Sequence, residues 1–283
     1  MSNIAVVTDS TSDIPRTLAE QLGITVIPLS VVHEGVVYRD GIDITPEQFY
    51  SMLEKAKELP TSSQPSPKQF IDVYKPLIES GKEILSFHIS KGLSSTVDAA
   101  RLAAEQLAPD RIHVVDTRSI SFGIALQAIE AARLAAQEIC ASSILERLLR
   151  LKEQSEVLFS LDTLHYLHKG GRIGKVSSLL GNLLNIKPIV RVEDGIYVPV
   201  GKVRSVKHAL AGMVDYLAQK FGRNKVLIGV GHGQGLSYAK CLLELAMSRL
   251  NIAEEPVLFE VGPVIGVHTG PGTVGIIARP VAY

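Results

Sequence analysis

Three polar segments of the 283-residue chain carry the side chains best suited to binding or chemistry. They are Thr61-Ser62-Ser63-Gln64, residues 90–96 with Ser94 and Ser95, and the late segment that contains His268, Thr269 and Gly270. The second segment directly precedes an expected helix, and hydroxyls beside the free N–H groups of a first helical turn form a seat for an anion. A serine near a histidine is also the pairing that nucleophilic catalysis requires. Taken alone, a Ser-Ser-Thr sequence is equally explained by helix capping.

Sequence motifs for nucleotides and metals do not fit. No Gly-x-Gly-x-x-Gly follows the first expected strand, and Gly170-Gly171-Arg172-Ile173-Gly174-Lys175 lacks the spacing and the hydroxyl of a P-loop. His165 and His168 lie three residues apart with no carboxylate in ligand register. We therefore expect no metal and no cofactor.

The first half of the chain has the rhythm of a parallel sheet. Short β-rich runs at residues 4–8, 24–32, 84–89 and 112–115 alternate with amphipathic stretches. These runs end in polar residues, where open α/β sheets place their ligands. Residues 35–41 look like an added hairpin. We expect residues 1–155 to form an N-terminal α/β domain with a mainly parallel sheet and flanking helices.

The pattern changes near Glu156. Strands are expected at residues 157–161, 187–192, 195–200, 226–230, 257–261 and 274–278, with helices at 206–221 and 237–250. Glu193-Asp194-Gly195 between two of the strands favours a hairpin turn. We therefore expect residues 156–283 to form a C-terminal α+β domain with a mixed or antiparallel sheet.

Composition excludes several classes of protein. Hydrophobic residues make up 46% and charged residues 20%, with 29 Lys+Arg against 29 Asp+Glu, which is typical of a packed globular protein and disfavours a nucleic-acid surface. The most hydrophobic helix candidate, residues 121–141, carries too many polar groups to span a membrane. Two distant cysteines and a first strand that begins at Ile4 suit a cytoplasmic protein.

Read together, these segments resemble the DegV family, the fatty-acid-binding subunits of bacterial fatty acid kinase. The resemblance covers the whole chain. It rests on seven motifs in order, namely Thr8-Asp9-Ser10-Thr11-Ser12-Asp13, residues 61–67, Leu93-Ser94-Ser95-Thr96, Asp116-Thr117, Lys169-Gly170-Gly171-Arg172-Ile173, Lys187-Pro188-Ile189 and His268-Thr269-Gly270. It implies the two-domain fold described above.

The resemblance also implies a site for a fatty acid carboxylate. Aligned on Gln64-Pro65, the hydroxyl of the first loop falls on Ser62, with Thr61 as the alternative one residue away. In the second turn the family's serine corresponds to Ser94, while Ser95 replaces a glycine. His268 lies close by, and Arg172, Thr269 and Gly270 are expected to form a rim for the headgroup and a partner. Residues 178–186 are a candidate lining for the tail, although plain core packing explains these leucines nearly as well.

The resemblance thus predicts a non-catalytic lipid-binding protein. It would bind a long-chain fatty acid, present the carboxyl group to an ATP-binding fatty acid kinase subunit, and hold the acyl phosphate for phospholipid synthesis. The alternative is a phosphotransferase or hydrolase for a small acid that uses Ser94 or Ser95 as nucleophile and His268 as base.

Overall fold

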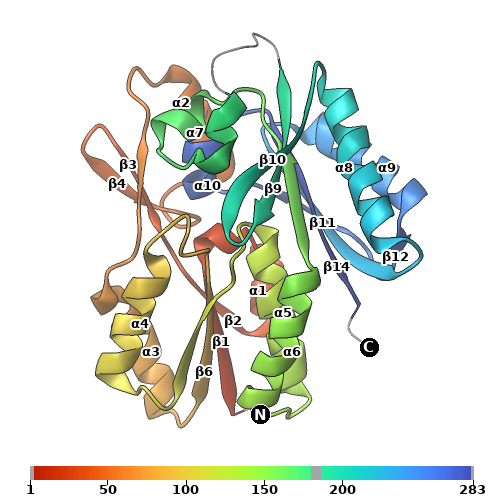
Figure 1. Ribbon diagram of the computed structural model, residues 1–283. Helices are drawn as coiled ribbons and strands as arrows, with labels where there is room; N and C mark the ends of the chain where they lie inside the picture. Colours follow the sequence, from red (N-terminus) through yellow and green to blue (C-terminus); the bar gives the residue numbers. More distant parts are fainter. Residues whose placement is uncertain (1–2, 180–185, 282–283) are drawn as a thin grey trace.

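The computed structural model describes residues 3–179 and 186–281. Its first sheet has four parallel strands in the order β2-β1-β6-β7 (Figure 1). The strands are β2 (Ile24–Ile27), β1 (Ile4–Asp9), β6 (Glu83–His88) and β7 (Ile112–Asp116). All three neighbouring pairs run parallel, so each connection between strands crosses over and contains a helix.

Helices cover both faces of this sheet. On one face α3 (Pro67–Glu79) and α4 (Thr96–Leu107) bury an apolar cluster against β1 and β6. The other face is covered by α1 (Arg16–Leu22), α5 (Phe122–Ala136) and α6 (Ala141–Gln154). A single helix over residues 121–141 was expected, but Gln137 ends α5 and Glu138 has a positive φ of 61°. The polar stretch 137–140 therefore separates two helices.

A small antiparallel sheet with the order β4-β3-β5 extends from this half. It consists of β3 (Ser30–His33), β4 (Val36–Arg39) and β5 (Thr61–Ser63), with α2 (Pro46–Lys55) packed beside it. The expected continuous strand over residues 24–32 is wrong. Pro28 lies between β2 and β3 and has no N–H for a ladder, and the two strands join different sheets.

The second sheet contains seven strands in the order β10-β9-β8-β14-β11-β12, and β13 also pairs with β11. Most pairings are antiparallel, but β12 and β13 run parallel to β11. The strands are β8 (Glu156–Ser160), β9 (Lys187–Glu193), β10 (Ile196–Val203), β11 (Lys225–Gly233), β12 (Asn251–Ile252), β13 (Val257–Glu260) and β14 (Thr273–Pro280).

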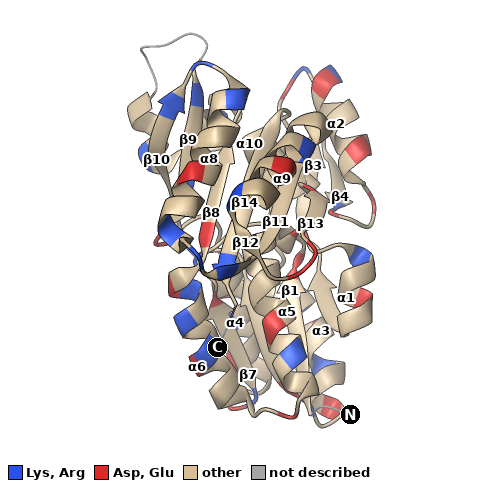
Figure 2. Ribbon diagram, turned by 90° about the vertical axis from the view of Figure 1, so that its right-hand side faces the viewer, with Lys and Arg blue, Asp and Glu red and all other residues tan. Residues whose placement is uncertain are grey.

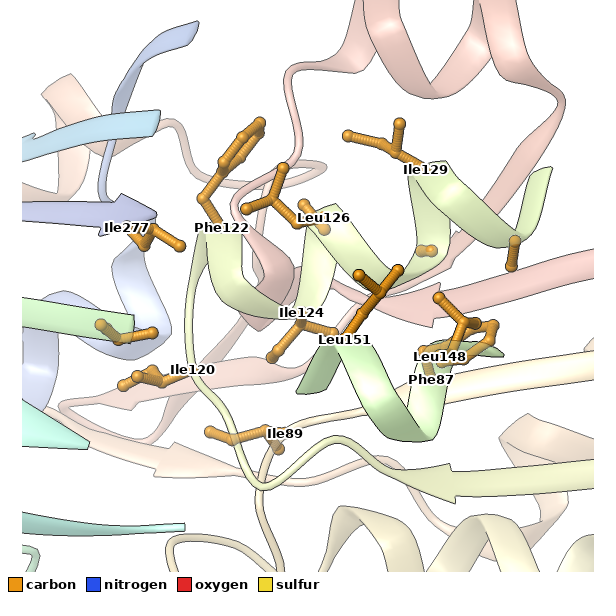
Figure 3. Close-up of a cluster of buried hydrophobic side chains, with 14 of the residues drawn as sticks. Phe87, Ile89, Ile120, Phe122, Ile124, Leu126, Ile129, Leu148, Leu151 and Ile277 are labelled. Carbon is orange, nitrogen blue, oxygen red and sulfur yellow. The ribbon is translucent and has the colours of Figure 1, made fainter. Parts of the chain in front are cut away.

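One face of the second sheet carries α8 (Val206–Phe221) and α9 (Leu236–Arg249), which share a hydrophobic cluster with β8, β11 and β14. The opposite face meets α5, so α5 lies between the two sheets and contributes to a core common to both halves. Figure 3 shows Ile120 and Ile277 at the end of this core that faces the second sheet.

The expected fold class is confirmed, with one parallel sheet and one mixed sheet flanked by helices. The division at residues 155 and 156 stays a prediction. The second sheet does begin with β8, but α10 (Pro263–Thr269) packs in one cluster with β3 and α2 of the first half. Three short helical segments complete the described part of the chain, namely η1 (Ser10–Ser12), α7 (His165–Lys169) and η2 (Gly174–Leu179).

Charged side chains are interspersed over the face shown in Figure 2 rather than gathered in one patch. Over residues 3–179 and 186–281, no helix combines the length and the hydrophobicity needed to cross a membrane.

Candidate functional site

Ser62 and His268 form the centre of the site. Because β5 pairs with β3 as a regular strand, its side chains alternate, and Thr61 and Ser63 are exposed while Ser62 is half-buried. His268 lies in the last turn of α10. The Ser62 Oγ and His268 Nε2 atoms are 2.7 Å apart, a hydrogen-bond distance. The pairing connects residues that are 206 positions apart in the sequence.

His268 is uncharged at neutral pH in this arrangement. Burial, assisted by the nearby positive charge of Arg172, lowers the pKa of His268 to about 4. Its Nδ1 atom is buried and has no hydrogen-bond partner among the described residues. It lies against Gly170, where a Cβ would come within 2.3 Å of Nδ1. A neutral imidazole donates through only one nitrogen. Because the pKa of His268 is low, the ring becomes positively charged near neutral pH only if a bound anion raises that pKa.

Arg172 connects the loop after α7 to the Ser94 turn. Its Nη1 donates to the carbonyl of Gly170 at 2.8 Å, and its Nε donates to the carbonyl of Leu93 at 3.3 Å. Because Gly170 follows the last residue of α7, Arg172 binds a free carbonyl at that helix end. The guanidinium also lines the same pocket as Ser62 and His268.

Ser94 organises the start of α4. Its Oγ lies 2.8 Å from Thr96 Oγ1 and accepts a hydrogen bond from the Thr96 backbone N–H at 3.3 Å. The helix begins at Thr96, one residue before the expected start. Ser95 occupies the N-cap position but makes no side-chain capping bond and is exposed. Ser94 therefore caps the helix and lines the pocket at once.

These polar groups surround a pocket with about 480 Å³ of empty space. Ser62, Ser94, Arg172 and His268 supply its polar lining, and Leu29, Ile89 and Val264 contribute apolar walls. The pocket lies beside the carboxyl ends of β2 and β6, since Leu29 and Ile89 follow those strands, and this is the edge at which the sequence predicts a ligand.

An apolar cavity continues inward from this pocket. It has about 390 Å³ of empty space between the start of α5, α10 and the second sheet. The two hollows share two lining residues, Ile120 and Ile265. The remaining lining is almost entirely apolar, and includes Val157, Phe159, Phe259, Val261 and Ile277.

The other predicted site residues lie around this pair of hollows. Thr61 faces an outer depression that also borders Ser62, Arg172 and His268. Ser95 lines neither hollow. Thr269 is buried, donates to the carbonyl of Ile265 at 3.1 Å and lines the apolar cavity. Gly270 has a φ of 72° and lies under the ring of Tyr166, where a Cβ would come within 2.1 Å of a ring carbon.

Polar residues at the carboxyl ends of β1 and β6 form a buried hydrogen-bond network with one another. The Asp9 carboxylate accepts from the backbone N–H groups of Thr11 and Ile89 and bonds to His88 Nδ1 at 2.9 Å. His88 continues to Ser86, which bonds to the hydroxyl of Tyr74. This network is fully buried, so these residues support the site rather than line it.

Sequence reasoning missed the residues of the apolar cavity. Of the proposed tail segment 178–186, residues 180–185 lie outside the described residues, and Leu179 packs against the core between the sheets. A usable signal was present in Gly231 and Gly275, which lie opposite each other on β11 and β14 and both line the cavity. Glycines inside strands often mark a close approach by another group. Here a Cβ on Gly231 would collide with the ring of Phe259.

No group of three or more His, Cys, Asp or Glu side chains arranged to hold a metal ion occurs in the described part of the chain.

Comparison with known proteins places these features in a family. A family model described as "Uncharacterised protein, DegV family" matches residues 3–281. A DegV domain-containing protein from Deinococcus radiodurans is 37% identical over 284 residues, covering 99% of each chain. One from Staphylococcus aureus is 34% identical over 278 residues, covering 98% of this chain and 99% of its own.

Solved structures are similar over almost the whole chain. A fatty-acid-binding DegV family protein from Thermus thermophilus has a TM-score of 0.95 and 36% identity, covering 99% of this chain and 100% of its own. DegV from Bacillus subtilis, named as a fatty acid binding protein, has a TM-score of 0.87 and 31% identity, with coverages of 99% and 100%. A stearic acid-binding protein from Eubacterium ventriosum has a TM-score of 0.84 and 28% identity, with coverages of 99% and 98%.

Proposed function

We propose that this chain, which belongs to the DegV family, binds a long-chain fatty acid with its carboxylate at Ser62, Ser94 and His268. The main support is the junction at Ile120 and Ile265, where a polar pocket meets an apolar cavity. A fatty acid has the same two parts. The ligands of the Thermus, Bacillus and Eubacterium relatives agree with this assignment.

The tail supplies the affinity. Burial of about fifteen methylenes at ~0.8 kcal/mol each offers on the order of 12 kcal/mol before the costs of association and ordering. The cavity between α5 and the second sheet has walls of Val, Ile and Phe side chains that match such a chain. Its position behind the polar pocket directs the methyl end inward and leaves the carboxylate near β5.

The polar pocket positions the headgroup. A buried carboxylate without donors is costly to desolvate. The hydroxyls of Ser62 and Ser94 donate to it, and Arg172 contributes a positive charge at the same pocket. A bound carboxylate also favours protonation of His268, against the effect of burial. Fatty acid binding therefore raises the pKa of His268 from its low starting value.

The protein itself performs no chemistry in this proposal. A separate ATP-binding kinase subunit phosphorylates the presented carboxylate, and the acyl phosphate feeds phospholipid synthesis. The outer depression beside the pocket is bordered by three cations, Lys57, Lys169 and Arg172, against one carboxylate, Glu58, so positive charge is in excess there. Such a basic surface suits an acidic partner and the negative charge that develops during phosphoryl transfer.

A Ser/His hydrolase or phosphotransferase is the second candidate, since Ser62 and His268 have the spacing of a nucleophile and its base. In such sites a third group orients the histidine through its other nitrogen. Nδ1 of His268 has no such partner among the described residues. Ser94 bonds to Thr96 instead of His268. These contacts favour the carrier.

The two functions are separated by extracting the purified protein with organic solvent and identifying the bound lipid by mass spectrometry. The carrier is expected to release about one fatty acid per chain and to hydrolyse neither ATP nor esters. An extract free of fatty acid, together with turnover that Ser62→Ala abolishes, would establish the enzyme instead.

A further inference from the structure

Two buried carboxylates meet at the first turn of α10, the helix that carries His268. The backbone N–H of Gly262, its N-cap, donates to Asp13 Oδ1 at 2.9 Å. The backbone N–H of Val264 donates to Asp40. Asp13 and Asp40 are 9% and 5% exposed. Both belong to the first half of the chain, whereas α10 belongs to the second.

Hydroxyl groups tie the same carboxylates to the parallel sheet and to α5. Ser10 Oγ donates to Asp40 at 2.9 Å, and Ser121 Oγ donates to Asp13. Ser121 is the N-cap of α5 and lines the apolar cavity. Asp13 thus joins the starts of two helices, α5 and α10, on either side of the proposed tail site.

The contact is close and specific. A Cβ on Gly262 would come within 2.9 Å of Asp13 Oδ1 and within 3.5 Å of both Asp40 oxygens. No Lys or Arg side chain pairs with either carboxylate in the described part of the chain; the titratable groups that interact with them are Asp9, Tyr50 and Tyr197. Two desolvated carboxylates without a cationic partner are costly. Neutral Ser or Asn side chains cap helices well, so capping alone does not explain why carboxylates occupy these positions.

We propose that Asp13 and Asp40 are positioning residues, which hold the first turn of α10 and thereby set His268 against Ser62 at the other end of the helix. This inference rests on the proposed fatty acid site. α10 has only seven residues and one continuous ladder of backbone hydrogen bonds, so a shift of its first turn moves His268 as well.

The test combines substitutions in the capping contact with two readouts. Asp40→Ala and Asp13→Ala remove a carboxylate. Gly262→Ala keeps both but inserts a methyl group between them, at a φ of −67° that alanine adopts freely. Asp40→Asn keeps an acceptor and serves as the conservative rescue. Asp43→Ala removes a carboxylate three residues from Asp40 that bonds only to Arg39, and is the matched control.

The first readout is the titration of the His268 ring, followed by NMR in the ligand-free protein and assigned with a His268→Gln variant. The second is the affinity for palmitate and oleate by calorimetry after delipidation. In Ala variants and Gly262→Ala the pKa of His268 is expected to rise from about 4 toward 6.5 as the ring leaves its buried position. Affinity should fall about tenfold, the effect of one lost buried hydrogen bond. Asp40→Asn and Asp43→Ala should resemble the wild type.

Folded Gly262→Ala and Asp→Ala variants with an unchanged His268 titration would overturn the positioning role, as would an Asp40→Asn variant as defective as Asp40→Ala. If an Ala variant does not fold, Gly262→Ala and Asp40→Asn still decide. A wild-type protein that binds neither acid contradicts the proposed function alone, because the ring titration does not depend on ligand.

Discussion

At the scale of single residues, the pair Ser62 and His268 lies at the centre of the pocket that we propose binds the carboxylate. A neutral imidazole 2.7 Å from a hydroxyl is a hydrogen-bonding surface without net charge. Arg172 supplies the positive charge at one side, and its own bonds to Gly170 and Leu93 fix its place. The pocket therefore offers donors from several directions, which suits a carboxylate better than a neutral ligand.

Replacing the proposed donors should weaken binding without unfolding the protein. Ser62→Ala and Ser94→Ala each remove a hydrogen bond to a charged acceptor, worth roughly 1.5–3 kcal/mol. Calorimetry with palmitate should show affinity lower by a factor of ten or more in each variant, while tail burial preserves measurable binding. The matched controls are Thr61→Ala and Ser95→Ala, which truncate exposed neighbours. Loss in Thr61→Ala with no effect of Ser62→Ala would move the site to the outer depression.

The register of Ser62 illustrates what sequence can provide. Alignment on Gln64-Pro65 selected Ser62 over Thr61, and strand alternation in β5 places Ser62 inward. Its role stays a prediction. The hydrogen bond to His268 depends on the packing of α10 against β3 and α2, a contact between distant segments that no local pattern contains. The low pKa of His268 is likewise a consequence of burial, which the sequence alone does not define.

At the scale of elements, the junction between pocket and cavity depends on the segment that leads into α5. Ile120 lies on that segment and is 4% exposed, and like Ile265 of α10 it lines both the pocket and the cavity. Local periodicity predicted most helices and strands here, because each has its own capping residues and apolar face. The cavity was not predictable, since it arises where Gly231 lies against Phe259 and Gly275 lies against Phe159, which belong to other strands.

Narrowing the junction should exclude the tail. In Ile120→Phe the larger ring occupies the passage, and each methylene kept out of the cavity costs ~0.8 kcal/mol, so exclusion of two lowers affinity about tenfold. We expect weaker binding of palmitate and less co-purified lipid, with a melting temperature close to that of the wild type because the ring fills empty space. Leu102→Phe on α4, where the side chain is 46% exposed, is the control. Unaltered lipid content in a folded Ile120→Phe protein would show that the tail lies elsewhere.

The contact between Asp13 and α10 should make stability depend on pH. Burial raises the pKa of Asp13 to about 8 and that of Asp40 to about 7, from the ordinary aspartate value of 3.8. Between these values the folded state binds more protons than the unfolded state, so the free energy of unfolding falls as pH rises through this window. Asp13→Asn removes one titrating group and should flatten the profile.

Urea unfolding at several pH values from 6.5 to 9 measures this effect. At the lower end the titration of His268 in the unfolded chain acts with the opposite sign, and it is common to the wild type and Asp13→Asn. The wild type is expected to lose stability across the interval, and Asp13→Asn to lose less. Asp43→Ala, which removes an exposed carboxylate whose pKa lies near 2, should follow the wild-type slope. Identical slopes in wild type and Asp13→Asn would show that Asp13 is ionised throughout.

At the scale of the whole molecule, two sheets share one core through α5. The short helix α10 of the second half packs against the small sheet β4-β3-β5 and α2 of the first half. In Figure 1 α10, α7 and α2 lie together beside the small sheet that contains β3 and β4, on the opposite side of the second sheet from α8 and α9. The sequence predicted both sheets because each half has its own pattern. The resemblance already implied a site with residues from both halves, Ser62 and Ser94 together with His268, but the sequence did not predict α10, the helix that carries His268.

This arrangement leads to the prediction that binding and phosphorylation are separable. Arg172 and His268 border both the inner pocket and the outer depression, so they contact the carboxylate side that a kinase must reach. Developing negative charge in phosphoryl transfer is stabilised by a guanidinium and by an imidazole that a bound anion helps to protonate. Arg172→Ala and His268→Ala proteins should still retain fatty acid, because burial of its tail supplies most of the affinity. Acyl phosphate formation with the cognate kinase and ATP should slow by a factor of ten or more in both variants. Lipid content by mass spectrometry and the initial rate with ligand-loaded protein give the two quantities separately.

The control for this experiment is Lys240→Ala, which removes an exposed positive charge from α9 on the far side of the second sheet. It should support the wild-type rate. His268→Gln keeps a side-chain donor but does not titrate, so partial recovery of lipid content without recovery of rate would assign the charge of His268 to phosphoryl transfer and its hydrogen bond to binding. Rates equal to wild type in loaded Arg172→Ala and His268→Ala would leave both residues with structural roles, because the kinase would then reach the carboxylate without their charges.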